Sequence, residues 1–114
     1  MPGADGWYIN MLWYPDLQLP GSLKFVQDYK AMFGTIPQAT AVYYIMSLGA
    51  AIQAIEQAGT TDREKIAQVA RSGQLYWEVS PMGPCRWGTD GLPSVTGFVA
   101  QVQRGAFVGV EEIK

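Results

Sequence analysis

The hydrophobic and polar positions of the chain predict one strand, three helices and then a set of short strands. Residues 7–14 are a run of aromatic and β-favouring side chains ended by Pro15, which predicts one buried strand. After turn-forming residues over 15–21, helical spacing predicts an amphipathic helix over 22–33 that Ser22 caps and Gly34 ends. Its inward face is expected to hold Phe25, Val26, Tyr29, Met32 and Phe33.

The longest predicted element is a helix over 39–57. No charged residue lies between Lys30 and Glu56, and apolar side chains recur every three or four residues, so this helix is apolar almost all round. We therefore expect it to be the central element of the fold. Gly34 and Pro37 interrupt the uncharged stretch, and the part after Pro37 is short and polar for a membrane span of about 20 apolar residues. A buried helix explains the pattern better than a membrane span.

The second half of the chain changes from helix to strand. A third helix is predicted over 63–71, capped by either Thr61 or Asp62. Short strands are expected over 75–79 and 85–87, and a hairpin over 95–102 and 106–110 that turns at Gln103-Arg104-Gly105. The order of elements predicts an α/β fold. A length of 114 residues allows one domain with its own core.

The composition excludes several classes of function. The chain has no histidine and a single cysteine, Cys85, which removes the commonest general base and metal ligand and leaves no second thiol for a redox or zinc site. We expect Cys85 to be buried, and we expect no metal, no cofactor and no enzyme activity. A net charge of −2 lacks the basic footprint that nucleic-acid binding requires. The carboxylates form no catalytic pattern.

Five short motifs, in this order along the chain, resemble one known family. They are FVQDYKAMFGTIP at 25–37, AIEQAG at 54–59, DREKIA at 62–67, GPCRW at 83–87 and VAQVQRG at 99–105. Together they resemble the C-terminal third of type I periplasmic substrate-binding proteins, which include the leucine/isoleucine/valine-binding proteins of ABC importers. The sequence departs from the family where Ile45-Met46 replaces a Gly/Ala-Tyr-Asp motif in the long helix.

The resemblance implies a two-lobed fold that closes on a ligand, and 114 residues suffice for only part of it. Residues 1–114 are then a single partial domain, with crossover or hinge segments near 11–16 and 91–96. The implied function is part of an extracytoplasmic receptor for branched-chain amino acids or related small carboxylates, with an ABC permease as partner and a periplasmic location. The opening residues, Met-Pro-Gly-Ala-Asp, are not those of a signal peptide.

The resemblance also suggests where a ligand would bind. An amino acid needs donors for its carboxylate, an acid for its ammonium group and an apolar wall, and this segment is expected to supply mainly the wall. The aromatic candidates are Tyr43 and Tyr44 on the long helix and Trp13 and Tyr14 at the crossover. Gln38 and Thr40 offer polar contacts at a helix N-terminus, which favours an anionic group. Core packing is the competing explanation for each aromatic residue.

A second hypothesis keeps the fold but not the ligand. The chain would then be a truncated, self-associating interaction module, because three helices and a few short strands leave the helix over 39–57 incompletely covered. It would form a homo-oligomer. In both hypotheses the 114-residue chain alone is expected to show no tight ligand binding.

Overall fold

The computed structural model describes residues 3–113, so residues 1, 2 and 114 of the predicted unit lie outside the described residues. Its elements agree with the predicted order of one strand, three helices and four further strands. In chain order they are β1 (Tyr8–Met11), α1 (Pro20–Phe33), α2 (Ala39–Ala58), α3 (Arg63–Ala70), β2 (Tyr76–Trp77), β3 (Cys85–Arg86), β4 (Gly97–Gln103) and β5 (Ala106–Ile113).

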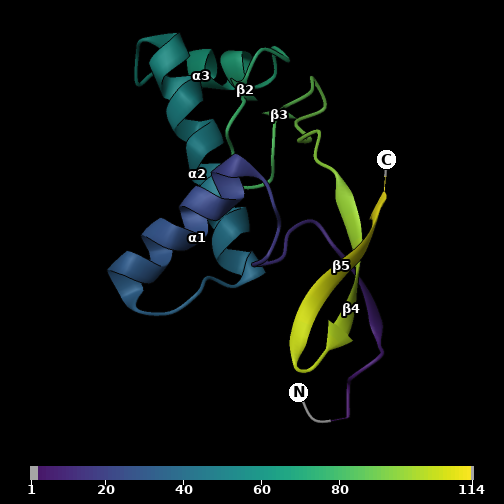
Figure 1. Ribbon diagram of the computed structural model, residues 1–114. Coiled ribbons are helices and arrows are strands. Elements are labelled where there is room, and N and C mark those ends of the chain that lie inside the picture. Colours follow the sequence, from purple (N-terminus) through teal and green to yellow (C-terminus); the bar gives the residue numbers. More distant parts are fainter. Residues whose placement is uncertain (1–2, 114) are drawn as a thin grey trace.

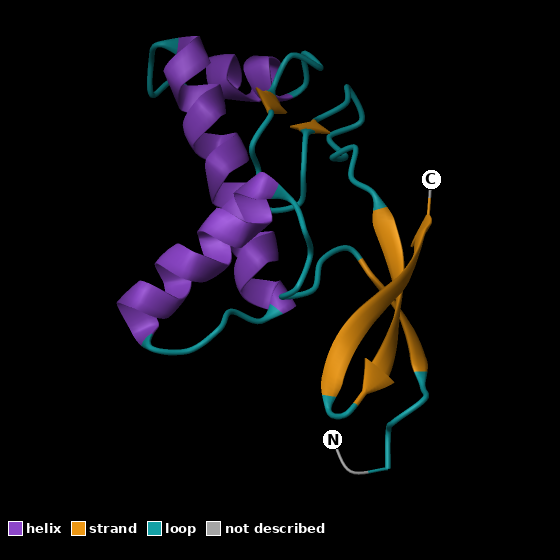
Figure 2. Cartoon of the chain, in the orientation of Figure 1, coloured by secondary structure: helices purple, strands orange, loops and turns teal. Residues whose placement is uncertain are grey.

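The molecule is elongated and has two parts (Figure 1). One part holds the three helices and the short β2–β3 ladder, and the other is an antiparallel sheet in the order β1-β4-β5. The radius of gyration is 16.1 Å, whereas a compact domain of about 100 residues has about 13 Å. Figure 2 shows that two loop segments, 12–19 and 87–96, join the sheet to the helical part.

The sheet follows the predicted hairpin but differs at its first strand. Arg104 and Gly105 form the β4–β5 turn with φ of 51° and 77°, the left-handed geometry of a two-residue hairpin, which glycine adopts without strain. The prediction of a buried strand over 7–14 was wrong: β1 has four residues, and Tyr8 is 67% exposed. Among the described residues β1 is an edge strand that pairs with β4 alone, so Tyr8 reflects β propensity and not burial, whereas the buried Trp13 lies beyond the end of the strand.

Helix α1 shows how tertiary contacts changed the predicted N-terminus. Ser22 was expected to cap the helix, but α1 begins at Pro20, and the buried Ser22 hydroxyl accepts a hydrogen bond of 2.8 Å from Nε1 of Trp13. Gly34 is confirmed at the C-terminus, where its N–H donates to the Lys30 carbonyl. Met32 and Phe33 were both expected to face inward, but both are exposed, because the last turn of α1 projects away from the core (Figure 1).

Helix α2 has the predicted bounds to within one residue, but it is not central. It buries Val42, Met46 and Ala54, while much of its remaining apolar surface is open to solvent. Helix α3 is capped as predicted, by the second of the two candidates: the Asp62 carboxylate accepts a hydrogen bond from the Lys65 N–H. None of the described helices combines the length and hydrophobicity needed to cross a membrane.

The hydrophobic core lies where the helices meet the two connecting segments. It contains Trp13 and Leu17 of the first connecting segment, Val42 and Met46 of α2 and, later in the chain, Leu75, Met82, Cys85, Trp87 and Phe98. Burial of Cys85 is confirmed, and burial raises the pKa of its thiol. The half-buried Trp77 packs on α2 at Gly49, where a Cβ atom would overlap ring carbon Cζ3. Glycine therefore allows the β2–β3 ladder to approach α2.

Candidate functional site

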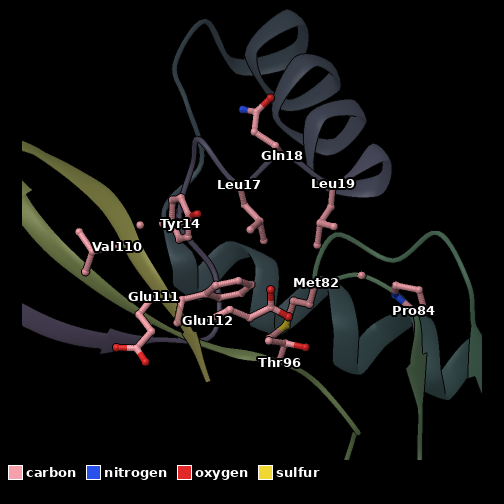
Figure 3. A pocket seen from close by; sticks show the side chains of 13 residues that line it. Tyr14, Leu17, Gln18, Leu19, Met82, Pro84, Thr96, Val110, Glu111 and Glu112 are labelled. Carbon is pink, nitrogen blue, oxygen red and sulfur yellow. The ribbon is translucent and has the colours of Figure 1, made fainter. Parts of the chain in front are cut away.

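One cavity, which we call the junction cavity, opens where the sheet meets the first connecting segment. Its volume is about 540 Å³. Figure 3 shows its lining side chains, which are Tyr14, Leu17, Gln18, Leu19, Met82, Pro84, Thr96, Phe98, Val110, Glu111 and Glu112, with Gly83 and Gly109. The Glu112 carboxylate points toward Thr96 and Met82, whereas Glu111 points away from them (Figure 3).

Tyr14 fixes one wall of the junction cavity. Its ring meets Phe98 of β4 edge-on, with the ring centroids 5.5 Å apart and the planes at 85°. Its phenol lies against Gly109 of β5, where a Cβ atom would overlap the phenol oxygen. These contacts tie the first connecting segment to two strands of the sheet. Tyr14 therefore has a packing role whether or not a ligand enters the cavity.

A second cavity, which we call the helix-end cavity, lies between the N-terminus of α2 and the β4–β5 turn. It has a volume of about 490 Å³. Apolar and polar groups share its lining, which consists of Met11, Pro15, Asp16, Thr35, Ile36, Pro37, Gln38, Ala39, Gly105, Ala106 and Phe107. Residues far apart in sequence therefore meet around one space that adjoins both parts of the molecule.

The chemistry of the helix-end cavity comes from the way α2 begins. Gln38 is the N-cap residue, with φ of −93° and ψ of 162°, and no side chain caps the first turn. That turn also lacks an acidic residue. The Ala41 N–H already donates to the Gln38 carbonyl, so the N–H groups of Ala39 and Thr40 are the ones left for a ligand. The helix dipole places partial positive charge there, so this end of α2 suits an anion.

The structure distributes the six predicted site residues over several places. Gln38 lines the helix-end cavity, and Tyr14 lines the junction cavity. Thr40, Tyr43 and Tyr44 line a neighbouring hollow of about 260 Å³ on the next turns of α2.

Trp13 lines none of the cavities described here. It is fully buried and its indole N–H is bonded to Ser22, so it belongs to the core. Asp16 is the residue that sequence analysis missed: it lines the helix-end cavity beside Gln38. Its position directly after Pro15 at the crossover is the signal that could have pointed to it. Within residues 3–113 no three His, Cys, Asp or Glu side chains gather in a way that could hold a metal ion.

The sequence matches the family model described as "Periplasmic binding protein" over residues 1–106. The chain belongs to this family. The resemblance inferred from the five short motifs is therefore confirmed, and so is the mixed α/β fold with three helices and antiparallel strands. Periplasmic binding proteins are solute-binding proteins and not enzymes.

Solved structures of periplasmic binding proteins share the fold of this chain. A leucine-binding protein from Thermotoga maritima is 26% identical, with a TM-score of 0.85 over 97% of this chain and 31% of its own. A solute-binding protein of an ABC transporter from Rhodopseudomonas palustris, in complex with 3,4-dihydroxybenzoic acid, is 18% identical, with a TM-score of 0.85 over 100% of this chain and 32% of its own.

A leucine-, isoleucine-, valine-, threonine- and alanine-binding protein from Brucella ovis is 18% identical, with a TM-score of 0.79 over 97% of this chain and 32% of its own. The chain thus spans about a third of the length of these proteins. No curated protein sequence matches the chain.

Proposed function

We propose that the chain forms part of an extracytoplasmic solute-binding receptor of an ABC importer, with a branched-chain amino acid or a related small carboxylate as ligand. Membership of the periplasmic binding protein family supports the receptor function and the location outside the cytoplasm. The ligands named for its structural relatives, leucine and 3,4-dihydroxybenzoic acid, both carry a carboxylate. An ABC permease is the partner that this function requires.

The uncapped N-terminus of α2 is the observation that carries the proposed ligand class. In the helix-end cavity a ligand carboxylate would accept hydrogen bonds from the first N–H groups of α2 and from the Gln38 amide. The Asp16 carboxylate, on the same lining, would pair with an ammonium group, and Ile36 and Phe107 would face the apolar side chain. The volume of about 490 Å³ is typical of small-molecule sites.

The other predicted residues take secondary places in this proposal. Thr40, Tyr43 and Tyr44 extend the polar and aromatic surface along α2 beside the helix-end cavity. Tyr14 lies in the other cavity, and Trp13 lies in the core. Because this chain spans only about a third of its relatives, we expect the remaining ligand contacts to come from outside these 114 residues. Binding by the chain alone is therefore expected to be weak.

The test uses amide chemical shifts of the chain during titration with leucine, isovalerate and isobutylamine. Leucine and isovalerate should shift the amides of residues 38–41, because both carry the carboxylate. Ala39→Pro removes one N–H donor at a position where proline suits a helix, and the extended Gln38 tolerates a following proline. This variant should bind isovalerate at least about tenfold more weakly, the loss expected for one hydrogen bond to a charged group.

Asp16→Asn distinguishes the binding contribution of the ligand's ammonium group from that of its carboxylate. It should weaken leucine and isobutylamine binding while leaving isovalerate binding unchanged, because only the first two ligands carry an ammonium group. Ala39→Gly is the matched control for Ala39→Pro, since it alters the same residue but keeps its backbone N–H. The carboxylate would bind elsewhere if the ligands changed other amide chemical shifts but not those of residues 38–41. The same conclusion would follow if Ala39→Pro bound isovalerate as tightly as the wild type.

A further inference from the structure

The junction cavity takes no part in the proposed carboxylate site, and its chemistry differs from that of the helix-end cavity. Its floor is apolar and buried, because Leu17, Met82 and Phe98 are 4%, 6% and 8% exposed. Tyr14 forms a fixed wall, since its ring meets Phe98 edge-on and its phenol lies against Gly109. Core packing therefore holds a space of about 540 Å³, which is within the range of small-molecule sites.

A β-bulge determines which acidic side chain faces the junction cavity. Side chains alternate between the two faces of a strand, so Gly109 and Glu111 would share one face if β5 were regular. The β4–β5 register shifts, however, and Val110 is an extra residue that has no partner on β4. The bulge therefore turns Glu112, which lies opposite Phe98, toward the cavity and turns Glu111 away from it (Figure 3).

The charge at the junction cavity is negative. The Glu112 carboxylate points toward Thr96 and Met82 across the cavity (Figure 3). The lining, which lies wholly in the described part of the chain, contains no Lys or Arg. The one ion pair among residues 3–113 joins Lys24 to Asp28 in α1 and does not involve this carboxylate. A positively charged group that enters the cavity therefore meets an acid and no competing cation.

Two further features agree with this sign of charge. Helix α1 begins beside the cavity, since its N-cap residue Leu19 is part of the lining, and a helix N-terminus favours anions. Gly21 and Ser22 are buried, however, and neither lines the cavity, so this helix end does not offer its N–H groups there. The rings of Tyr14 and Phe98 do line it, and aromatic rings attract cations to their faces.

We propose that the junction cavity binds an organic cation, namely a primary amine attached to an apolar group of several carbon atoms. The ammonium group has three N–H donors and would pair with the Glu112 carboxylate and donate to the Thr96 hydroxyl. The apolar group would lie on Leu17, Met82 and Phe98. The helix-end cavity suits a carboxylate instead, so this proposal does not depend on the ligand proposed for that site.

The test follows amide chemical shifts of the chain during titration with three probes that share a phenyl ring. Phenethylamine should shift the amides of residues 96–98 and 109–112 in a saturable way. 2-Phenylethanol keeps the apolar group without the charge, and it should bind at the same residues at least about threefold more weakly. 3-Phenylpropionate carries the opposite charge and should leave these amides unmoved.

Two matched variants test the role of the carboxylate. Glu112→Gln removes the charge that faces the cavity, and Glu111→Gln makes the same change at the neighbouring residue, which points away (Figure 3). Because Glu112 is exposed and water weakens the ion pair, Glu112→Gln should weaken phenethylamine binding by about threefold to fivefold. Glu111→Gln should weaken it by less than about 1.5-fold at physiological salt, which screens a charge outside the cavity. Neither variant should alter 2-phenylethanol binding.

Three results would overturn the proposal: phenethylamine that leaves residues 96–98 and 109–112 unmoved, equal losses in the two glutamine variants, or 3-phenylpropionate that binds the cavity as tightly as phenethylamine. Asp16→Asn keeps this test apart from that of the proposed function, because it removes the acid of the helix-end cavity. The phenethylamine shifts at 96–98 and 109–112 should persist in this variant, whether or not residues 38–41 bind a carboxylate. Their loss would also refute the junction site.

Discussion

The hydrogen bond between Trp13 and Ser22 makes a sharp prediction, because it joins the first connecting segment to the start of α1 inside the core. Both residues are 0% exposed, and Trp13 Nε1 lies 2.8 Å from Ser22 Oγ. Ser22→Ala removes the hydroxyl group that accepts this hydrogen bond and leaves the rest of the side chain in place. The indole N–H of Trp13 is then left buried without a partner.

Two opposing effects set the size of the change. A buried donor without a partner costs about 1–3 kcal/mol. Alanine favours the helix over serine by about 0.5 kcal/mol, which offsets part of that cost. We therefore expect Ser22→Ala to lower the free energy of unfolding by about 1–2 kcal/mol. The exposed Ser47 lies in α2 and is the matched control, and Ser47→Ala should be neutral or slightly stabilising.

The assay is urea unfolding of the chain, followed by tryptophan fluorescence and by far-ultraviolet circular dichroism. Ser22→Ala should lower the midpoint with an unchanged slope, which separates lost stability from a changed unfolded state. The double variant Trp13→Phe/Ser22→Ala should lose less than the two single losses combined, because each change removes the partner that the other leaves unpaired. Equal midpoints for Ser22→Ala and Ser47→Ala would refute the reasoning.

Three further predictions test other parts of the fold. Gly49→Ala should lower the urea midpoint although alanine favours helices, because its Cβ overlaps the Trp77 ring and overpacking costs about 1–3 kcal/mol. Asp62→Ala should cost about 1 kcal/mol through loss of the α3 cap, and Asp62→Asn should restore most of it in the same assay. Burial raises the pKa of the Cys85 thiol, so ionisation favours the unfolded chain. The free energy of unfolding linked to this thiol is fully present below the ordinary thiol pKa and is lost as pH rises through the pKa of the folded chain. At high pH the urea midpoint should therefore fall more in the wild type than in Cys85→Ala.

Elements with local causes were predictable from the sequence. Gly34 ends α1 because the left-handed geometry at that position favours glycine, and Asp62 caps α3 because its carboxylate reaches the N–H three residues on. The Arg104-Gly105 turn follows the same logic, since two adjacent left-handed residues make a tight hairpin. Each of these signals involves residues a few positions apart, so neighbouring side chains and backbone geometry determine the outcome.

The candidate site was predictable only in part. Gln38 stood out because it precedes a long helix, and the structure places it on the helix-end cavity. Asp16 was missed because it and Gln38 are separated in sequence by helix α1. They line the same cavity only in the folded chain. The sequence predicts Trp13 as a possible ligand contact, because nothing in the sequence shows that its indole N–H donates a hydrogen bond to the buried Ser22 hydroxyl. Such meetings depend on the path of the chain between the residues.

The sequence by itself determined the order of the helices, most of their ends, the hairpin turn and the membership of the family, because these depend on local patterns and on motifs in order. The tertiary structure decided which apolar surfaces are buried. The composition of α2 predicts a helix with apolar faces on both sides, but burial needs a second layer within reach. In this chain the sheet lies beyond two connecting segments. Leu48, Ile52 and Ile55 of α2 therefore stay exposed although their pattern is that of a core helix.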